Sequence, residues 1–254
     1  MAGYKETPRQ KMISMMYLVL TAMLALNVSV EILNAFTTVN ESVEQSNATL
    51  QSRIDETYNK FDQQYAINTS KVKENWTKAQ ELKQLSNELI GYINNMKYEV
   101  ISLSEGFSIE EAKTAKLHLL SSKDNYDVPT NYFINNMHAD SLQMRIENYK
   151  SDVKNILPEK VRDGFDLGLV TDGEYQNANG EMEDWKTHNF YHTVLAADVA
   201  LLNKLIMDVQ NTEYSIVNYL YSSLSEENFK FDKIDVKIIP KSNYVFVGEN
   251  YEAD

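Results

Sequence analysis

The stretch "TPRQKMISMMYLVLTAMLALNVSVEI", residues 7–32, contains a run of nineteen uncharged residues from Met12 to Val30, bracketed by Lys11 and Glu31. At about 1.5 Å of rise per residue, a helix of this length spans roughly 28 Å, close to the roughly 30 Å of a bilayer's hydrocarbon core. A signal peptide, a buried core helix and a membrane span all fit such a run. The flanking residues separate these three interpretations.

The start of the stretch carries strong helix signals. Thr7 can cap the helix, Pro8 suits its first position, and Gln10 completes a capping box. No proline or glycine interrupts the pattern from there to residue 32, so we expect one unbroken helix. A soluble core helix of this length would show a polar face, and few polar residues interrupt this one.

Basic residues followed by an apolar run are also typical of a cleaved signal peptide. Here the run is longer than the usual apolar region, and no clear small-residue cleavage site follows it. The sequence therefore favours an uncleaved anchor at residues 12–31, with residues 1–11 in the cytoplasm and the rest of the chain outside. In a bacterium this is a single-pass inner-membrane protein with most of its mass in the periplasm.

The composition narrows the possible functions. The chain of 254 residues holds 24 basic and 37 acidic side chains, a net charge of −13, and it has no cysteine. Such a surface repels phosphate backbones, so we expect no nucleic-acid partner. Without cysteine there are no disulfides, no thiol catalysis and no thiolate metal sites. Few glycines and prolines indicate a mainly α-helical protein.

Residues 32–225 repeat apolar positions at helical spacing and predict a periplasmic helical bundle. The first helix continues to a turn near residues 67–69, and the second ends at Gly106. The expected later helices cover residues 108–120, 140–157 and 189–224. Residues 159–186 are the least regular part, and the short loops predict antiparallel neighbours.

Residues 226–254 change to a two-residue apolar period. Phe229, Phe231, Ile234, Val236 and Ile238 follow this period, and "NYVFVGENY" resembles a further strand. Two strands cannot bury a face alone, so we expect a linker and the first strands of a β-sandwich domain that continues past residue 254.

Sequence motifs of catalysis are absent. There is no phosphate loop, nucleophile elbow or thiolate set, so we expect no enzyme, no catalytic residue and no bound cofactor. His188 and His192 stand four residues apart, a spacing that can hold a metal on a helix, and Asp184 is a candidate for a third ligand. The sequence fixes no further ligand nearby, and we expect no metal site.

Two faces of the predicted span carry informative residues. Tyr17, Thr21, Ala25 and Ser29 form a ladder at i, i+4 spacing, and the last three are small enough for a second helix to approach closely. Arg9 lies on a different face. From the residues alone, Arg9 is best interpreted as a positive anchor that reaches the lipid headgroups.

"TPRQKMISMMYLVLTAMLALNVSVEILNAF" closely resembles the start of the GldM (PorM) family of motor subunits in gliding motility and type IX secretion. "KDNYDVPTNY", "WKTHNFYHTVLAADVALLNKLIMDVQNTE" and "IPKSNYVFVGENYEA" resemble other segments of that family. The resemblance implies one inner-membrane helix, a helical first periplasmic domain, and later β-sandwich domains that reach outer periplasmic components.

The same resemblance implies partners and an energy source. Members of the family form homodimers whose paired membrane helices sit inside a ring of GldL subunits. The complex uses the proton gradient, and no cofactor, to produce mechanical work. The family's membrane arginine corresponds to Arg9, which faces a GldL glutamate, and its membrane tyrosine corresponds to Tyr17. These two residues are the expected proton-coupling contacts.

Two other classes of protein stay open from the sequence. One is a membrane-anchored sensor whose periplasmic helical domain binds a ligand, although eleven residues before the span leave little room for an output domain. The other is a secreted helical protein with a cleaved signal.

Overall fold

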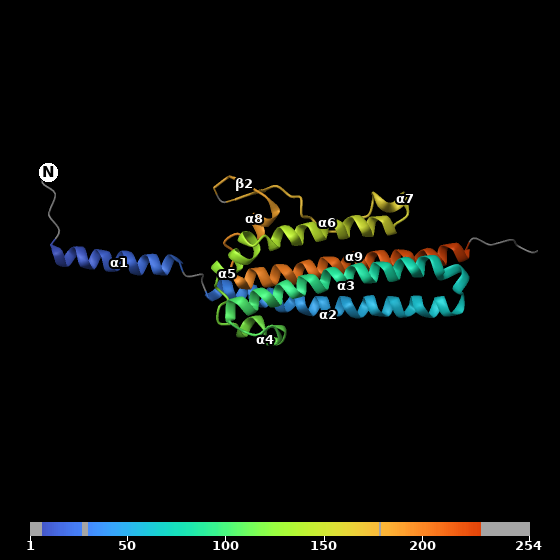
Figure 1. Ribbon diagram of the computed structural model, residues 1–254, viewed down its shortest axis with the longest axis horizontal. Coiled ribbons are helices and arrows are strands. Elements are labelled where there is room, and N and C mark those ends of the chain that lie inside the picture. Colours follow the sequence, from blue (N-terminus) through green and yellow to red (C-terminus); the bar gives the residue numbers. More distant parts are fainter. Residues whose placement is uncertain (1–6, 27–29, 178, 230–254) are drawn as a thin grey trace, which may run out of the picture.

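The computed structural model describes residues 7–26, 30–177 and 179–229, and the chain in these ranges is mainly helical. Helix α1 covers Pro8–Leu26, and three long helices follow: α2 (Val30–Ile67), α3 (Thr69–Glu105) and α9 (Leu195–Phe229). The predicted mainly α fold with a helical bundle is confirmed. Figure 1 shows α1 apart from this bundle.

The remaining elements lie between α3 and α9. They are α4 (Ile109–Thr114), η1 (Leu117–Leu119), α5 (Asp127–Thr130), η2 (Asn131–Asn135), α6 (His138–Ile156), α7 (Glu159–Arg162), β1 (Tyr175–Gln176), β2 (Met182–Glu183) and α8 (Trp185–Phe190). The strands β1 and β2 pair antiparallel, with Tyr175 opposite Glu183. This small hairpin falls within the region 159–186 that the sequence marks as irregular.

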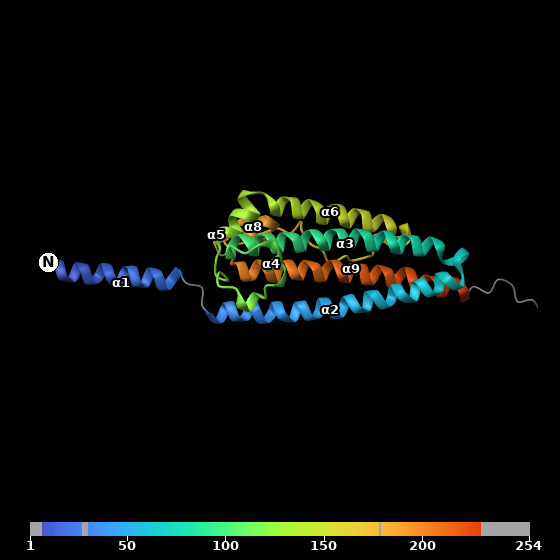
Figure 2. The same ribbon diagram turned by 60° about the horizontal axis from the view of Figure 1, so that its bottom comes forward.

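Helix α9 packs along both α2 and α3, and α6 packs on α3. Figures 1 and 2 place α6 and α2 on opposite sides of the α3–α9 pair. The shared apolar core includes the fully buried Phe61, Leu82, Ile93, Leu142 and Leu202, contributed by four helices. Burial of this apolar surface is the main force that holds the helices together.

The helix directions differ from the predicted antiparallel bundle. Asn47 of α2 bonds Asn203 of α9, and Tyr58 of α2 bonds Glu213 of α9, so residue numbers rise together and these helices run parallel. Among α2, α3, α6 and α9, only α3 runs opposite to α9, since Tyr149 of α6 meets Ser86 of α3 while Arg145 of α6 lies over Tyr92 of α3. The prediction of antiparallel neighbours rests on mostly short loops, whereas the chain between α6 and α9 is long enough to return along the bundle.

Several predicted boundaries are confirmed by local signals. Helix α2 ends at Ile67 and α3 begins at Thr69, as the predicted turn requires. Gly106 ends α3 with φ +74°, a left-handed conformation that suits glycine. Ser108 and Glu111 form the expected capping box at the start of α4.

Two predicted helices are wrong in extent. The helix expected over residues 108–120 ends at Thr114, because Ala115 is extended and lets Leu117 and Leu120 reach the core. The helix expected from residue 189 is instead two helices, α8 and α9. The backbone between them includes His192 at φ +53°, which an α-helix cannot contain.

Both ends of the predicted architecture lie partly outside the described residues. Among the described residues, no helix combines the length and the hydropathy needed to cross a bilayer. The predicted span at residues 12–31 includes residues 27–29, which lie outside the described ranges, so the continuity of α1 with α2 stays a prediction. Helix α9 includes Phe229, the first residue of the predicted strand pattern, and residues 230–254 also lie outside the described ranges.

Candidate functional site

The start of α1 positions Arg9. The Thr7 backbone N–H donates to Gln10 Oε1 at 3.1 Å, and the Gln10 backbone N–H donates to Thr7 Oγ1 at 3.4 Å. This reciprocal pair is the predicted capping box. Pro8 is the first helical residue, so Arg9 lies in the first turn of α1, where its side chain is exposed.

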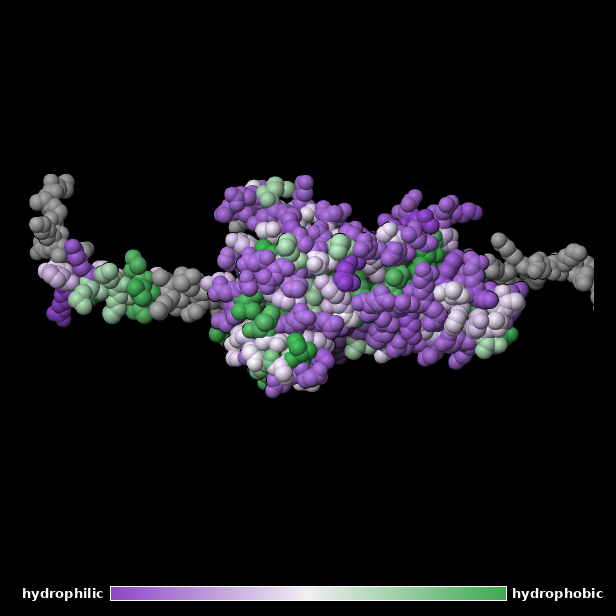
Figure 3. Space-filling view, in the orientation of Figure 1, coloured by the Kyte–Doolittle hydropathy of each residue, from purple (hydrophilic) through white to green (hydrophobic). Residues whose placement is uncertain are grey.

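Helix α1 presents an apolar surface with no cover from the bundle. Every described side chain from Thr7 to Thr21 is exposed, including Tyr17 at 64 % and Leu18 at 71 %. Over the bundle, by contrast, the face seen in Figure 3 is mainly hydrophilic. An apolar helix exposed along this length favours contact with lipid or with another protein.

The predicted residues of α1 do not converge on one point. Arg9 and Tyr17 are eight residues apart, about 12 Å along a helix axis, and their directions differ by about 80°. Thr21 follows Tyr17 by one turn on the same face. Ala25 belongs to α1, but its side chain lies outside the described part, as does the whole of Ser29. The packing ladder therefore stays a prediction beyond Thr21.

A first polar cluster, built around the buried Asn40 and Asn203, joins α2, α3 and α9. Asn203 of α9 donates through Nδ2 to Asn40 Oδ1 at 2.8 Å and to Glu44 Oε1 at 3.1 Å, and its Oδ1 accepts from Lys97 Nζ at 2.8 Å. Asn47 donates to the Asn203 carbonyl at 3.0 Å. Burial lowers the pKa of Lys97, while the Glu44 charge opposes that shift. The cluster fixes the register of three helices, because sliding one helix along the others would leave buried polar groups without hydrogen-bond partners.

A second buried polar cluster lies further along the bundle. Glu213 of α9 bonds the Tyr58 hydroxyl of α2 at 2.9 Å, and Ser86 of α3 bonds the Tyr149 hydroxyl of α6 at 2.9 Å. All four side chains are buried. Four helices thus meet around polar groups in the middle of an apolar core.

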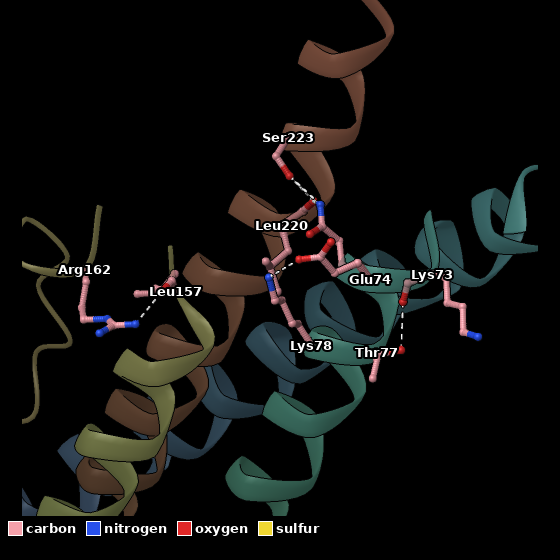
Figure 4. A network of polar contacts seen from close by, with 9 residues as sticks. Lys73, Glu74, Thr77, Lys78, Leu157, Arg162, Leu220 and Ser223 are labelled. Carbon is pink, nitrogen blue, oxygen red and sulfur yellow. Dashed lines mark hydrogen bonds and ion pairs between the residues drawn. The ribbon is translucent and has the colours of Figure 1, made fainter. Parts of the chain in front are cut away.

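Polar contacts continue to the end of the bundle where α2 turns into α3. Asn75 of α3 donates to Ser223 Oγ at 2.9 Å and to the Leu220 carbonyl at 3.4 Å on α9, as Figure 4 shows for the labelled Ser223 and Leu220. The ion pair between the exposed Glu74 and the half-buried Lys78, at 2.7 Å, contributes only about 0.3–0.5 kcal/mol. The contacts between helices, rather than the surface pairs, hold this end together.

Asp198 near the start of α9 is completely buried. Thr193 Oγ1 donates to its Oδ1 at 2.7 Å, and its Oδ2 has no hydrogen-bond partner among the described residues. Burial raises the pKa of Asp198 well above its ordinary value. A protonated carboxyl is therefore the form that the fold stabilises here.

The two histidines do not share a helix face. His188 belongs to α8 and stacks on Tyr175 at 4.2 Å between ring centroids, whereas His192 lies beyond the end of α8 at positive φ. The helical spacing assumed for a metal pair is therefore wrong. Asp184 caps α8 by accepting from the Thr187 backbone N–H at 2.9 Å. Within the described ranges, no cluster of histidines and carboxylates is arranged to hold a metal.

The sequence reasoning missed Asn203, Asp198 and Glu213, although a signal was present. Each stands three or four residues from buried apolar positions on both sides, within the apolar stripe of α9: Leu195, Val199, Leu202, Ile206, Val209 and Ile216. A polar residue on such a stripe predicts a buried, partnered group.

Comparison with known proteins assigns the chain to a family. A family model described as the GldM N-terminal domain matches residues 31–223. A comparison with curated proteins gives no match. The matched range runs from the first turn of α2 almost to the end of the described part of α9, so it contains the whole bundle and both buried polar clusters. Because the match covers more than half of the chain, the protein belongs to the GldM family.

Proposed function

We propose that this protein is an inner-membrane motor subunit which, with GldL-type partners, converts the proton gradient into the mechanical work of type IX secretion and gliding. The observation that carries the proposal is α1: a capped helix whose side chains from Thr7 to Thr21 are all exposed, in a chain of the GldM family. The family supports a role in the gliding motility and type IX secretion machinery, and the helix supplies a means of reaching the membrane.

In this proposal α1 supplies most of the membrane anchor at residues 12–31. Its basic start, with Arg9 and Lys11, stays in the cytoplasm, and the acidic bundle stands in the periplasm. The bundle acts as a stiff arm, because two buried polar clusters and a continuous core hold its long helices in register. The arm would pass the motion on to outer periplasmic components.

Arg9 is the proposed proton-coupling contact, with Tyr17 further along the helix. A guanidinium stays protonated in almost any environment, and a nearby cation lowers the pKa of a carboxyl group. A GldL-type carboxylate that approached Arg9 would release its proton, and on moving away it would bind one. This alternation would couple proton flow to stepwise motion.

The proposed homodimer uses two surfaces. In α1, the small residues Thr21, Ala25 and Ser29 permit a second helix to approach closely. In α2, the apolar side chains of Ile32 and Val39 are 50 % and 54 % exposed, while Leu33 and Thr37 turn inward. These exposed apolar side chains at the start of α2 offer a contact for the second copy.

The test compares Arg9→Ala and Arg9→Lys with Lys11→Ala, which removes a neighbouring exposed cation from the start of the same helix. Secretion or gliding is measured alongside membrane insertion and co-purification with the ring subunit. We expect Arg9→Ala to abolish movement with the complex intact, Arg9→Lys to impair movement clearly, and Lys11→Ala to retain it. If Arg9→Lys behaves as wild type and Arg9→Ala fails only because it is not inserted correctly, Arg9 serves only as a membrane anchor and not as a proton-coupling contact.

The alternative function is a membrane-anchored sensor with a ligand-binding helical domain. The feature that favours it is a groove of about 410 Å³ between α2 and α9, whose lining includes Ser46, Thr49, Arg53 and Asn211. A sensor would keep secretion after Arg9→Ala and lose its response after Arg53→Ala. The motor proposal expects the reverse.

A further inference from the structure

Glu213 occupies an unusual place for an acidic residue. Its side chain lies at the junction of α2, α3, α6 and α9, and the residue is only 2 % exposed. Tyr58 reaches it from α2, Ser86 from α3, and Tyr149 bonds Ser86 from α6. A buried carboxylate is costly unless several donors or a cation stabilise its charge.

The hydrogen bonds that the Tyr58 hydroxyl can make depend on whether Glu213 carries a proton. The Tyr58 oxygen lies 2.9 Å from Glu213 Oε1 and 3.1 Å from the Ala79 carbonyl oxygen. A phenol has a single proton to donate, and a carbonyl can only accept. Both bonds form at once only when Tyr58 donates to Ala79 and a protonated Glu213 donates to Tyr58.

The charged and titratable groups around this cluster do not offset the free-energy cost of ionising the buried Glu213. From α2 come Tyr58 and Asp55, and from α3 comes Lys83, whose Nζ lies 4.7 Å from the centre of the Tyr58 ring. From α6 comes Tyr149. Lys83 favours the ionised carboxylate, whereas Asp55 opposes it.

Burial outweighs these effects and raises the pKa of Glu213 to about 7, against an ordinary value of 4.5. Burial also raises the pKa of both tyrosines, so neither phenol releases its proton in the neutral range. Glu213 is therefore the group of this cluster that changes charge near neutral pH.

We propose that Glu213 is a proton-binding site that couples the packing of α2, α3, α6 and α9 to the pH around the bundle. Protonation completes the bonds to Tyr58 and Ala79. Ionisation turns the Tyr58 proton towards the carboxylate, breaks the bond to Ala79, and places a charge in the core. The inference rests on the bundle alone and holds whether or not the chain is part of a motor.

The direction of the pH effect follows from linkage. The folded state binds the proton more tightly than the unfolded state does, so stability from this site is complete below pH 4.5. It is lost as pH rises to about 7 and changes little above that value. One such proton changes the unfolding constant by on the order of 40-fold between about pH 5 and pH 7.

The test measures chemical unfolding of the full chain in detergent from about pH 5 to pH 8. Glu213→Gln keeps the shape of the side chain and removes its titration, and Glu81→Gln changes an exposed glutamate of α3 as the matched control. We expect the Glu213→Gln substitution, unlike the control, to remove roughly 40-fold of the pH dependence of the unfolding constant. A Glu213→Gln variant with the wild-type pH dependence would overturn the proposal.

A second measurement does not depend on how the variant folds. Carbon-13 chemical shifts of labelled glutamate carboxyls in the folded chain give the midpoint at which each one ionises, and Glu213→Gln identifies the signal. We expect one glutamate with a midpoint near neutral pH, and Tyr58→Phe to move that midpoint upward, because the carboxylate loses a donor. Ionisation of Glu213 in the ordinary range of glutamate would overturn the proposal.

Discussion

Helices α1 and α9 differ in what covers their apolar side chains. Both are rich in apolar residues, but α9 buries Leu202 and Ile216 completely between α2 and α3, while α1 leaves Leu18 71 % exposed. The apolar surface of α9 is satisfied within the chain. The apolar surface of α1 can be covered only by lipid or by another protein. Helix α1 is therefore the basis of the functional proposal, whereas α9 stabilises the fold.

The polar residues of the two helices differ in the same way. In α9, Asn203 and Glu213 are buried and have partners from other helices. In α1, Arg9 and Tyr17 are exposed, and the bundle gives them no cover. A buried polar group with partners fixes packing, whereas an exposed one on an apolar helix is available to a partner subunit.

The largest expected effect comes from matched leucine truncations. Leu202→Ala removes a fully buried side chain and should lower the free energy of unfolding of the bundle by about 2–5 kcal/mol. Leu18→Ala, on α1, should leave that free energy unchanged. Urea unfolding in detergent, followed by circular dichroism, measures both. A comparable loss from Leu18→Ala would mean that α1 packs on the bundle.

The next effect concerns the membrane. Leu18→Arg should cost about 2.5–3.5 kcal/mol of insertion free energy if α1 crosses the bilayer, and should shift protein from the membrane fraction to the soluble fraction. Gln63→Arg, at an exposed position of α2, is the control and should not shift it. Quantitative fractionation of cells makes the comparison. Equal membrane retention in both variants would argue against insertion of α1.

A smaller effect tests the register of the bundle. Asn203→Ala leaves Lys97 and Asn40 without their amide partner and should cost about 1–3 kcal/mol. Asn211→Ala, at an exposed position of the same helix, should cost far less. The same urea experiment measures both variants. Equal costs would mean that the buried cluster does not stabilise the three-helix register.

Local signals made much of the fold predictable. The caps at Thr7 and Ser108, the glycine at position 106 and the turn after Ile67 depend on a few neighbouring residues, and each is confirmed. Helix α6 begins and ends within two residues of its predicted limits. Such signals act through backbone hydrogen bonds close in sequence, so one sequence is enough to find them.

The errors arise where tertiary contacts decide the local structure. The His192 backbone N–H donates to Thr130 Oγ1 at 3.1 Å, and the Leu195 backbone N–H donates to the Asn125 carbonyl at 2.8 Å. These contacts with a distant segment accompany the break between α8 and α9, which apolar spacing alone does not show. The buried face of α2 also depends on a distant segment, because Asn203 of α9 bonds the buried Asn40.

The candidate site was predictable only in part. The positions of Arg9, Tyr17 and Thr21 follow from helix geometry once α1 is recognised. The buried clusters could be located on the stripe of α9, but their partners could not. Tyr58 and Glu213 are 155 residues apart in sequence, and their meeting depends on α2 and α9 running parallel.

The most direct test of the central claim uses the absence of cysteine. Single substitutions Leu18→Cys and Gln63→Cys each introduce one thiol, in α1 and in an exposed position of α2. Labelling with a membrane-impermeant maleimide is measured in cells with only the outer membrane permeabilised, and again after denaturation. The account predicts that Gln63→Cys reacts at once and that Leu18→Cys reacts only after denaturation. Immediate reaction of Leu18→Cys, or protection of Gln63→Cys until the inner membrane is opened, would contradict an embedded α1 with a periplasmic bundle.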